Sequence, residues 1–456
     1  MRAEYHRGLQ LLVLFAMTMT AFAFPRLRLR GLRGQIAAKH RATIAPARPG
    51  SDPSRVTSAG SDQSLLTSVG WGALYLTSKF VRMRQLEAEA QSRAGPAVGS
   101  SGTMELDGTS LPPLNILCMD GGGILGRNHM AIVEEVEEVT GSSVHLSFDF
   151  VAGTSIGGCG ALFLSKYGPR ATVMARAAMR ELQHKCFADR SVRRLLRKGH
   201  FCADGRRQFI RDLCGEYEDT TRRDGPPGFA LAASRCSQAR HTFKPFLFRS
   251  YPSPSATGVA DGTSEARLWQ AVEATSAAPF MFPDTRMRSG NSRSGHALAK
   301  CDDAHKPLES NDLRLIDGGV LANDPTLLAI REARALFPGR SIGLIVSLST
   351  GVPVGKYQRR ARASEARHAR AVRKSLRHLA PQARYYRVVP RLPQPVSPIE
   401  TNEIVLEAME RAARVNFRSS LRGRQLLDAL QISHQQRSIE EHVVFQVAQE
   451  RTTPSR

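Results

Sequence analysis

The feature that most constrains the fold of this chain is a short apolar run that ends in a glycine cluster and leads directly into an amphipathic segment. The run is Leu114–Met119, which carries no charged residue and fits a buried strand of a parallel sheet. Residues 120–126 follow as DGGGILG, and apolar residues then recur at helical spacing through Arg127–Thr140, with glutamates facing outward. Gly141 is suited to end that helix. A strand, a tight turn and a helix in this order predict an α/β fold.

Two further apolar runs end in a polar residue beside glycines. Residues 148–152 predict a second strand, which leads into the pattern G-x-S-x-G with Ser155 between Gly153 and Gly157. In that pattern the serine occupies a sharp turn from strand to helix and exposes its hydroxyl at the start of the helix. Residues 313–317 predict a third strand, and its last residue is Asp317. Ser155 is therefore a candidate nucleophile and Asp317 a candidate partner for it.

A serine nucleophile needs a base, which in most serine hydrolases is a histidine oriented by an acid. The histidines that follow Asp317 lie in a strongly basic segment or near the C-terminus: His368, His378, His434 and His442. A carboxylate can take the proton instead in a site that excludes water, because a low dielectric strengthens its pull on the hydroxyl. We therefore predict a Ser155–Asp317 dyad, with Gly318 and Gly319 allowing the chain to turn away from the aspartate.

The glycine turn taken alone has two interpretations. Gly121, Gly123 and Gly126 match the dinucleotide fingerprint G-x-G-x-x-G between a strand and a helix. Backbone N–H groups at the start of a helix favour any anion, whether a pyrophosphate or the oxyanion of an acyl-transfer reaction. A dinucleotide-binding oxidoreductase would carry an acid at the end of the second strand, about 20 residues after the last glycine. Asp149 lies 23 residues after Gly126 but begins that strand, so the hydrolase interpretation is favoured.

The three motifs, DGGG-x-x-G, GTS-x-GG and DGG in this order and at these intervals, resemble those of the patatin-like phospholipases, which include plant patatins and calcium-independent phospholipase A2. The resemblance extends from residue 114 into the 420s, with an unlike region at residues 286–311. Further similar blocks lie at residues 244–251, 269–279, 317–325, 342–351 and 384–387. The resemblance implies a three-layer α/β/α sandwich with a mostly parallel central sheet, and we expect the catalytic domain to cover residues 113–430.

The resemblance also implies the chemistry of the site. Ser155 would attack an ester carbonyl, and Asp317 would take the proton and return it. The oxyanion would be stabilised by backbone N–H groups of Gly121, Gly122 and Gly123, with Ile156 as a further contributor. The residues that would shape the three motifs are Asp120, Gly126, Gly153, Gly157, Gly318 and Gly319. The implied substrates are fatty-acyl esters of membrane lipids such as phospholipids, galactolipids or lysolipids. No cofactor or metal is implied, since the family does not require calcium and no segment here resembles a calcium-binding loop.

One residue departs from the family pattern. Leu125 lies between the third and fourth glycines, where many members carry Arg or Lys, so the rate or the substrate preference is left open. Arg127, two residues further on, is the candidate to compensate. The alternative to an enzyme is a catalytically weak patatin-fold module that binds lipid or protein, and the presence of both Ser155 and Asp317 argues against it.

The formal net charge of +23 calls for an anionic partner or a solvated basic segment. Nine basic residues lie within residues 1–51, and nine more lie within residues 356–377, where Glu365 is the single acid. A helix predicted over residues 361–379 carries most of the second group and fits an anionic membrane surface. A mobile, solvated segment is the alternative. Nucleic acid is not expected, because Tyr357 is the single aromatic residue within residues 356–377 and no recognised nucleic-acid-binding module accompanies the basic residues. The oligomeric state is left open.

The chain before the first strand is predicted to carry targeting segments. Residues 1–24 have a basic start, an uncharged apolar run and small residues near its end, as a signal peptide does; a retained membrane anchor is the alternative. Residues 25–51 are rich in Arg and contain no acid, as is typical of a transit peptide. The two together, with Phe24 and Pro25 at the junction, resemble the two-part plastid leader of algae with secondary plastids. Secretion or an endomembrane location is the alternative.

The remaining segments are described by their composition. Residues 52–112 are expected to form a low-complexity region and linker with one candidate helix over residues 63–91, and residues 431–456 a C-terminal tail.

The seven cysteines are scattered, odd in number and without a C-x-x-C pair, so they predict neither a disulfide framework nor a zinc site. They are expected to act as small buried apolar residues.

Overall fold

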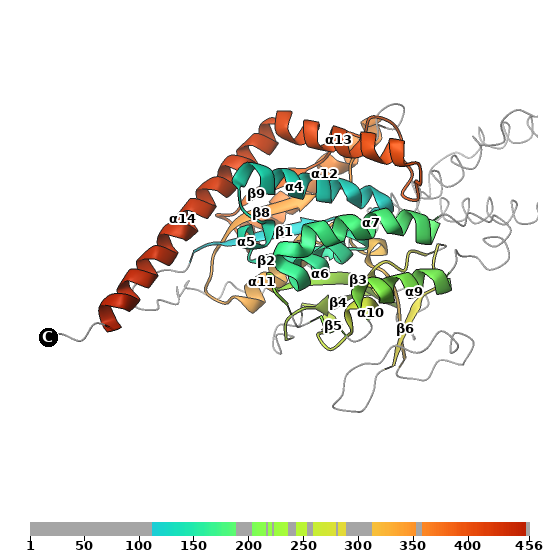
Figure 1. The fold of residues 1–456 in the computed structure, drawn as a ribbon, viewed down its shortest axis with the longest axis horizontal. Helices are drawn as coiled ribbons and strands as arrows, with labels where there is room; N and C mark the ends of the chain where they lie inside the picture. The colour runs from blue at the N-terminus through green and yellow to red at the C-terminus, as the bar shows by residue number, and fades with distance from the viewer. Residues whose placement is uncertain are drawn as a thin grey trace, which may run out of the picture. The chain divides into compact units, whose positions relative to one another are not determined.

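The computed structural model describes residues 112–187, 203–215, 218–220, 223–235, 243–252, 259–279, 281–288, 312–352 and 358–452. Within these residues the chain forms a central sheet with helices on both of its faces (Figure 1). The predicted signal peptide, transit peptide and candidate helix over residues 63–91 lie outside the described residues, as does most of the unlike region at residues 286–311. Those assignments remain predictions.

The central sheet has nine strands, and its main path runs in the order β5-β4-β3-β2-β1-β8-β9. Its middle is parallel, since β3, β2, β1, β8 and β9 pair in one direction. β4 and β7 pair antiparallel with β3, and β6 pairs antiparallel with β7. The strands are β1 (Leu114–Met119), β2 (Phe150–Thr154), β3 (Gly228–Arg235), β4 (Phe243–Arg249), β5 (Asp261–Thr263), β6 (Thr285–Arg288), β7 (Asp312–Asp317), β8 (Ile342–Leu348) and β9 (Arg384–Val388). The predicted three-layer α/β/α class with a mostly parallel sheet is confirmed.

Alternating side chains of β1 reach the two helical layers. Met119 lies against Gly160 of α6 on one face, whereas Ile116 belongs to a core that includes Leu328 of α11 and Val372 of α12 on the other. The α-helices are α4 (Arg127–Thr140), α5 (Val144–Ser147), α6 (Ile156–Tyr167), α7 (Ala171–Phe187), α9 (Ala203–Cys214), α10 (Leu268–Thr275), α11 (Thr326–Leu336), α12 (Gln358–Leu379), α13 (Glu403–Ser419) and α14 (Leu421–Thr452). Short 3-10 turns are η1 (Gly123–Gly126), η2 (Gly168–Arg170) and η4 (Gly318–Val320).

The first strand–turn–helix unit forms where its sequence pattern predicts it. All six residues of β1 are buried, as expected for an uncharged run in the middle of a parallel sheet. η1 contains the end of the glycine cluster, and α4 follows it directly. Gly141 ends α4 with a φ of 65°, and its N–H donates to the Glu137 carbonyl at 3.0 Å. A left-handed residue of this kind favours glycine, which explains the stop.

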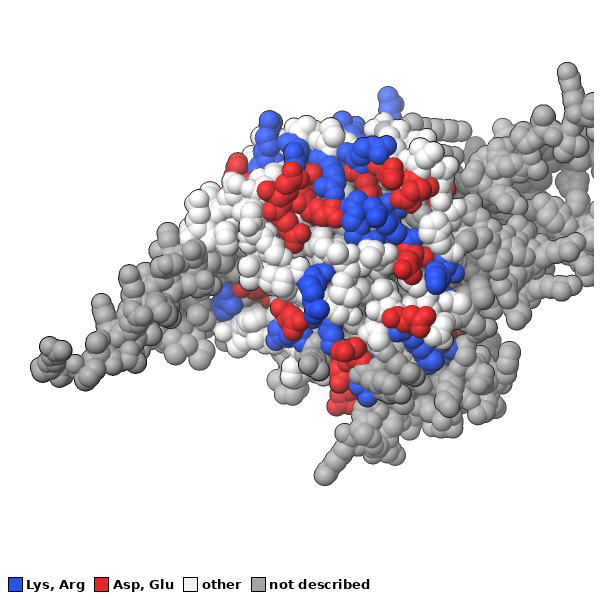
Figure 2. Space-filling model, viewed as in Figure 1, with Lys and Arg blue, Asp and Glu red and all other residues white. Residues whose placement is uncertain are grey.

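The glutamates of α4 were predicted to face outward, and for Glu135 this prediction is wrong. α13 packs against α4, so that Glu135 is only 3% exposed and accepts hydrogen bonds from Arg414 and Arg418. Arg176 of α7 pairs with Glu134 at 2.5 Å. Figure 2 shows that basic and acidic side chains alternate on the face formed by α4, α7 and α13. The helical pattern located a polar face but not the distant helix that covers it.

The C-terminal helices extend further than the sequence predicted. α12 begins at Gln358 and ends at Leu379. α14 continues through residue 430, where the catalytic domain was expected to end, and runs to Thr452. In the part of the chain that the structure describes, no helix is both long and apolar enough to cross a membrane.

The cysteines of the described residues are all free thiols. Cys118, Cys186 and Cys214 are buried, and Cys159 is half-buried. Burial raises the pKa of the Cys159 thiol to about 12. The burial of Cys118, Cys186 and Cys214 agrees with the prediction of small buried side chains, whereas Cys159 is only partly buried.

Candidate active site

Ser155 lies in a strained turn between β2 and α6. Its φ is 55° and its ψ is −124°, and among the described residues it is the one non-glycine residue with positive φ. Such a conformation costs on the order of 1–3 kcal/mol, which the surrounding packing must offset. A Cβ atom on Gly153 would overlap the Gly157 backbone, and one on Gly157 would overlap the Met119 carbonyl. The two flanking glycines are therefore needed so that the turn can close against β1.

Asp317 faces Ser155 because two strands share one edge of β3. β2 pairs with β3 up to Leu231, and β7 takes over the same edge from Ala232 onward in the opposite direction. β2 and β7 consequently meet end to end. Ser155 follows the last residue of β2, Asp317 is the last residue of β7, and the Ser155 hydroxyl donates to Oδ2 of Asp317 at 2.5 Å.

The Asp317 carboxylate is held at both oxygens. Oδ1 accepts the backbone N–H of Gly319 at 2.7 Å, while Oδ2 accepts the Ser155 hydroxyl. Ser155 is 9% exposed and Asp317 6% exposed. Burial raises the pKa of Asp317 to about 6, although the hydrogen bonds from Ser155 and Gly319 and the nearby Arg206 act to lower it. The carboxylate is mostly ionised at neutral pH, with a pKa close enough to 7 to accept and return a proton.

The glycine turn lies directly against the serine. A Cβ atom on Gly121 would stand 3.1 Å from the Ser155 Cβ and 2.7 Å from Oδ1 of Asn323. The three predicted oxyanion donors are not equivalent. The Gly121 N–H donates to the Asn323 carbonyl at 3.1 Å, so it is already engaged. The N–H groups of Gly122 and Gly123 have no acceptor among the described residues, and both residues are half-exposed.

Thr275 holds the backbone of Ser155 and was not singled out from the sequence. The Ser155 N–H donates to the Thr275 hydroxyl at 3.1 Å, and that hydroxyl donates to the Leu231 carbonyl at 2.6 Å. Thr275 is the last residue of α10 and is wholly buried. It therefore links the nucleophile turn to β3 from a helix that is remote from all three motifs in the sequence.

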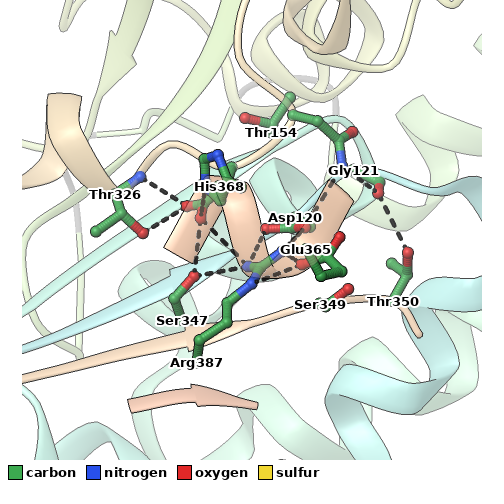
Figure 3. Close-up of polar contacts among 12 residues, drawn as sticks. Asp120, Gly121, Thr154, Thr326, Ser347, Ser349, Thr350, Glu365, His368 and Arg387 are labelled. Atoms are coloured by element: carbon green, nitrogen blue, oxygen red, sulfur yellow. Dashed lines mark hydrogen bonds and ion pairs between the residues drawn. The ribbon is translucent and has the colours of Figure 1, made fainter. Parts of the chain in front are cut away.

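A buried ion-pair network supports the glycine turn from below (Figure 3). Asp120, which directly precedes the turn, accepts two hydrogen bonds from the Arg387 guanidinium of β9, at 2.7 and 2.6 Å. Arg387 also pairs with Glu365 of α12 at 2.9 Å and with Asp324 at 3.3 Å. His368 Nε2 lies 2.5 Å from Oδ2 of the same Asp324.

The charges of this network shift one another's pKa values. Arg387 is 1% exposed, and the three surrounding carboxylates hold its pKa well above the ordinary value. In return, Arg387 and His368 hold the pKa of Asp324 well below its ordinary range, despite burial. Asp120 was predicted to support the motif. The sequence offered only a similar block around Arg387 and no indication that it reaches Asp120.

Arg127, the candidate to compensate for Leu125, is buried and paired with acids of α13. The Arg127 side chain is 3% exposed and ion-paired with Glu403, at 2.7 Å, and with Glu410, both on α13. Leu125 is also buried, in a small apolar cluster with Ile124, Leu392, Leu406 and Met409. The position where many family members carry a basic residue is therefore used for packing in this chain.

No described histidine forms a hydrogen bond or ion pair with Ser155 or Asp317. His368 is bound to Asp324, and burial lowers the pKa of His129, on α4, to about 3. In the same part of the chain no three His, Cys, Asp or Glu side chains are grouped as metal ligands would be. The arrangement at Ser155 thus consists of a hydroxyl, a carboxylate and free backbone N–H groups, which together can perform acyl transfer.

The chain is similar to proteins that are named as phospholipases. Residues 117–330 match the family model of the patatin-like phospholipases. Human calcium-independent phospholipase A2-gamma is 28% identical over 249 residues, which are 52% of this chain and 28% of that protein. Phospholipase A I of Arabidopsis thaliana is 24% identical over 52% of this chain and 21% of its own length. The cGAMP-activated phospholipase of Pseudomonas aeruginosa is 25% identical over 53% of this chain and 63% of its own length. The chain thus matches less than two thirds of each of these relatives.

Proposed function

Since the chain carries a patatin-like phospholipase domain over residues 117–330, we propose that it is a lipid acyl hydrolase that uses Ser155 as nucleophile and Asp317 as base. The observation that carries the proposal is the 2.5 Å hydrogen bond between the Ser155 hydroxyl and the Asp317 carboxylate, where β2 and β7 meet. The strained backbone of Ser155 adds support, because strain of this kind accumulates at functional sites.

The proposed reaction has two halves. Ser155 Oγ attacks the ester carbonyl carbon while Asp317 accepts its proton, and the oxyanion faces the free N–H groups of Gly122 and Gly123. The tetrahedral intermediate then releases the alcohol, which takes the proton from Asp317, and leaves an acyl-serine. Water attacks the acyl-serine while Asp317 accepts a proton from it, and the fatty acid is released as Asp317 returns that proton to Ser155 Oγ. No step requires a metal ion.

We propose fatty-acyl esters of membrane lipids as the substrate class, with phospholipids, galactolipids and lysolipids as the candidates. Support comes from the relatives, which are named as phospholipases, and from the match to the family model. We further propose peripheral contact with an anionic membrane surface through the basic residues 356–377. Binding to anionic vesicles that weakens as salt is raised is the expected result.

A serine-directed fluorophosphonate probe tests the nucleophile. The wild-type chain and a Ser419→Ala control, in which an exposed serine of α13 is removed, should both be labelled and should release fatty acid from lipid vesicles. Ser155→Ala should do neither, and chelation of calcium should leave the wild-type rate unchanged. Lipid binding by the wild type without labelling or turnover would favour the alternative of a non-catalytic patatin-fold module.

We also propose that residues 1–24 and 25–51 direct the chain through the secretory route to a plastid. The support is their composition alone. A fluorescent fusion of residues 1–51 should enter plastids of an alga with secondary plastids, and a fusion of residues 1–24 should stop in the endomembrane system. Cytosolic fluorescence of both fusions would contradict the proposal.

A further inference from the structure

A basic pocket lies outside the catalytic site, between α12, the end of β9 and the start of α14. Its volume is about 430 Å³, and its lining includes neither Ser155 nor any residue of the glycine turn. Five exposed arginines surround it: Arg362, Arg370 and Arg373 from α12, Arg391 beyond β9 and Arg422 from α14. A volume of this size falls within the range of small-molecule sites, which is about 300–1,000 Å³.

The pocket forms because short and long side chains alternate along one face of α12. Ala366 and Ala369 lie between the arginines on successive turns of one helix face, and their short side chains leave space that the longer side chains enclose. The neighbouring face of α12 is anchored in the core through Val372 and Leu376. The concave basic face therefore belongs to a helix that is fixed against the sheet.

The five arginines have no acidic partner among the described residues. None of them forms an ion pair there, and the guanidinium of Arg373 lies 5.6 Å from the ring of Tyr385, over its face. This contrasts with the face of α4 and α13, where Arg414 and Arg418 each pair with glutamates. Like charges on successive turns of one helix repel, so an anion in the pocket would relieve the repulsion.

The one carboxylate in the pocket lining is already neutralised. Glu365 pairs with Arg387 at 2.9 Å, and Arg387 forms part of the floor of the pocket. Within the described residues, a group that enters the pocket therefore meets five arginines that no carboxylate pairs with.

We propose that this pocket binds a phosphate group with two negative charges, carried by a small soluble molecule or by a lipid head group. The planar fork of arginine donates two parallel hydrogen bonds to phosphate oxygens, and every basic side chain in the lining is an arginine. Single-stranded nucleic acid fits poorly, because no aromatic side chain lines the pocket for base stacking. The site is separate from the proposed hydrolase dyad and does not depend on its activity.

Titration of the full-length chain with inorganic pyrophosphate at 150 mM salt tests the soluble form of this ligand. Arg370→Gln/Arg373→Gln should weaken saturable binding at least about tenfold. Arg367→Gln/Arg377→Gln removes the same charge from the same helix outside the pocket, and should change the affinity by less than about twofold. Arg422→Gln, on α14, should weaken binding independently of α12. Equal weakening by both double variants would show that binding depends only on the net charge of α12, and would overturn the proposal.

Vesicles distinguish the lipid source. Two sets of phosphatidylcholine vesicles with equal surface charge are compared. One set contains ether-linked phosphatidate, which has no ester to cleave, and the other contains oleate, which has no phosphate. Preference for phosphatidate that the pocket variant loses and the control variant keeps identifies a lipid head group. Pyrophosphate binding without that preference identifies a soluble ligand. The absence of both pocket-dependent pyrophosphate binding and pocket-dependent phosphatidate preference would refute the site.

Discussion

At the residue scale, the buried carboxylate of Asp317 has a raised pKa that suits the proposed base and reduces the stability of the fold at neutral pH. Burial raises its pKa to about 6, and the hydrogen bonds from Ser155 and Gly319 limit the shift. A wholly exposed carboxylate would be too weak a base, whereas an unsupported buried one would be protonated at neutral pH. The two hydrogen bonds place the group between these limits.

The pKa of Asp317 predicts the pH dependence of hydrolysis. The base must be ionised to accept the Ser155 proton, so kcat/KM should be constant above pH 7 and fall about tenfold per pH unit below about 6. Rates measured from pH 4.5 to 8.5 on a soluble ester, with circular dichroism to confirm folding, would check this. A rate that stays constant down to pH 5 would argue against Asp317 as the base.

The raised pKa of Asp317, which suits a base, lowers the free energy of unfolding at neutral pH. The folded pKa of about 6 lies above the ordinary 3.8, so ionised Asp317 destabilises the fold above pH 6, and the penalty disappears as the pH falls toward 3.8. A shift of this size corresponds to at most about 3 kcal/mol. Asp317→Asn should therefore be more stable than the wild type to urea at pH 8 and nearly equal at pH 4. Identical pH responses of the two proteins would contradict the argument.

At the element scale, the turns around Ser155 are held by contacts between segments distant in sequence. Gly157 packs against the end of β1, Gly126 packs against Ile156, and Thr275 of α10 bonds the Ser155 N–H. Each contact helps to fix the proposed oxyanion site relative to Ser155. Such positioning is as important to the rate as the identity of the reacting groups.

The glycine turn can be tested with two glycines that differ in their surroundings. Gly123 has a φ of 59°, and a Cβ there would overlap the Pro398 carbonyl oxygen, whereas Gly141 has a φ of 65° and open space around it. Gly141→Ala should cost about 1 kcal/mol of stability and leave kcat unchanged. Gly123→Ala should lower kcat at least about a hundredfold, because it displaces an oxyanion donor. Equal kcat values for the two variants would exclude Gly123 from the site.

Thr275 gives a second test at this scale. Thr275→Val keeps the shape but removes the acceptor of the Ser155 N–H, and should reduce kcat about 10- to 100-fold with little change in KM. Thr275→Ser restores the hydroxyl and should recover most of the rate. Failure of the serine variant to recover activity, while the valine variant loses it, would indicate a packing role for the methyl group instead.

At the scale of the whole molecule, Arg387 joins parts of the fold that are far apart in the chain. It links β9 to Asp120 at the end of β1, to Glu365 on α12 and to Asp324 before α11. All of these groups are buried, so removal of the guanidinium would leave three carboxylates without their common partner.

Arg387→Gln should therefore lower the free energy of unfolding by about 3–5 kcal/mol, measured by urea denaturation. Arg411→Gln is the matched control, because Arg411 pairs with Glu407 at 3.5 Å on the surface, with side chains 66% and 51% exposed. That variant should change stability by less than about 1 kcal/mol. Similar losses of unfolding free energy in the two variants would show that the buried network contributes no more to stability than the surface pair does.

Sequence alone predicted the strand–turn–helix units that the structure contains, because apolar periodicity and glycine placement are local properties of the chain. It also singled out Ser155 and Asp317, which we propose as nucleophile and base. It also predicted the fold class, through the order and spacing of the three motifs. It could not predict that β7 would meet β2 end to end along β3, which brings Ser155 and Asp317 together across 162 residues. Only the tertiary structure decided that the Gly121 N–H is bound to the Asn323 carbonyl and that Glu135 is buried. The contacts of Thr275 and Arg387 likewise depend on it. Hydrogen bonds and ion pairs between distant segments depend on three-dimensional proximity, and no local pattern in the sequence records it.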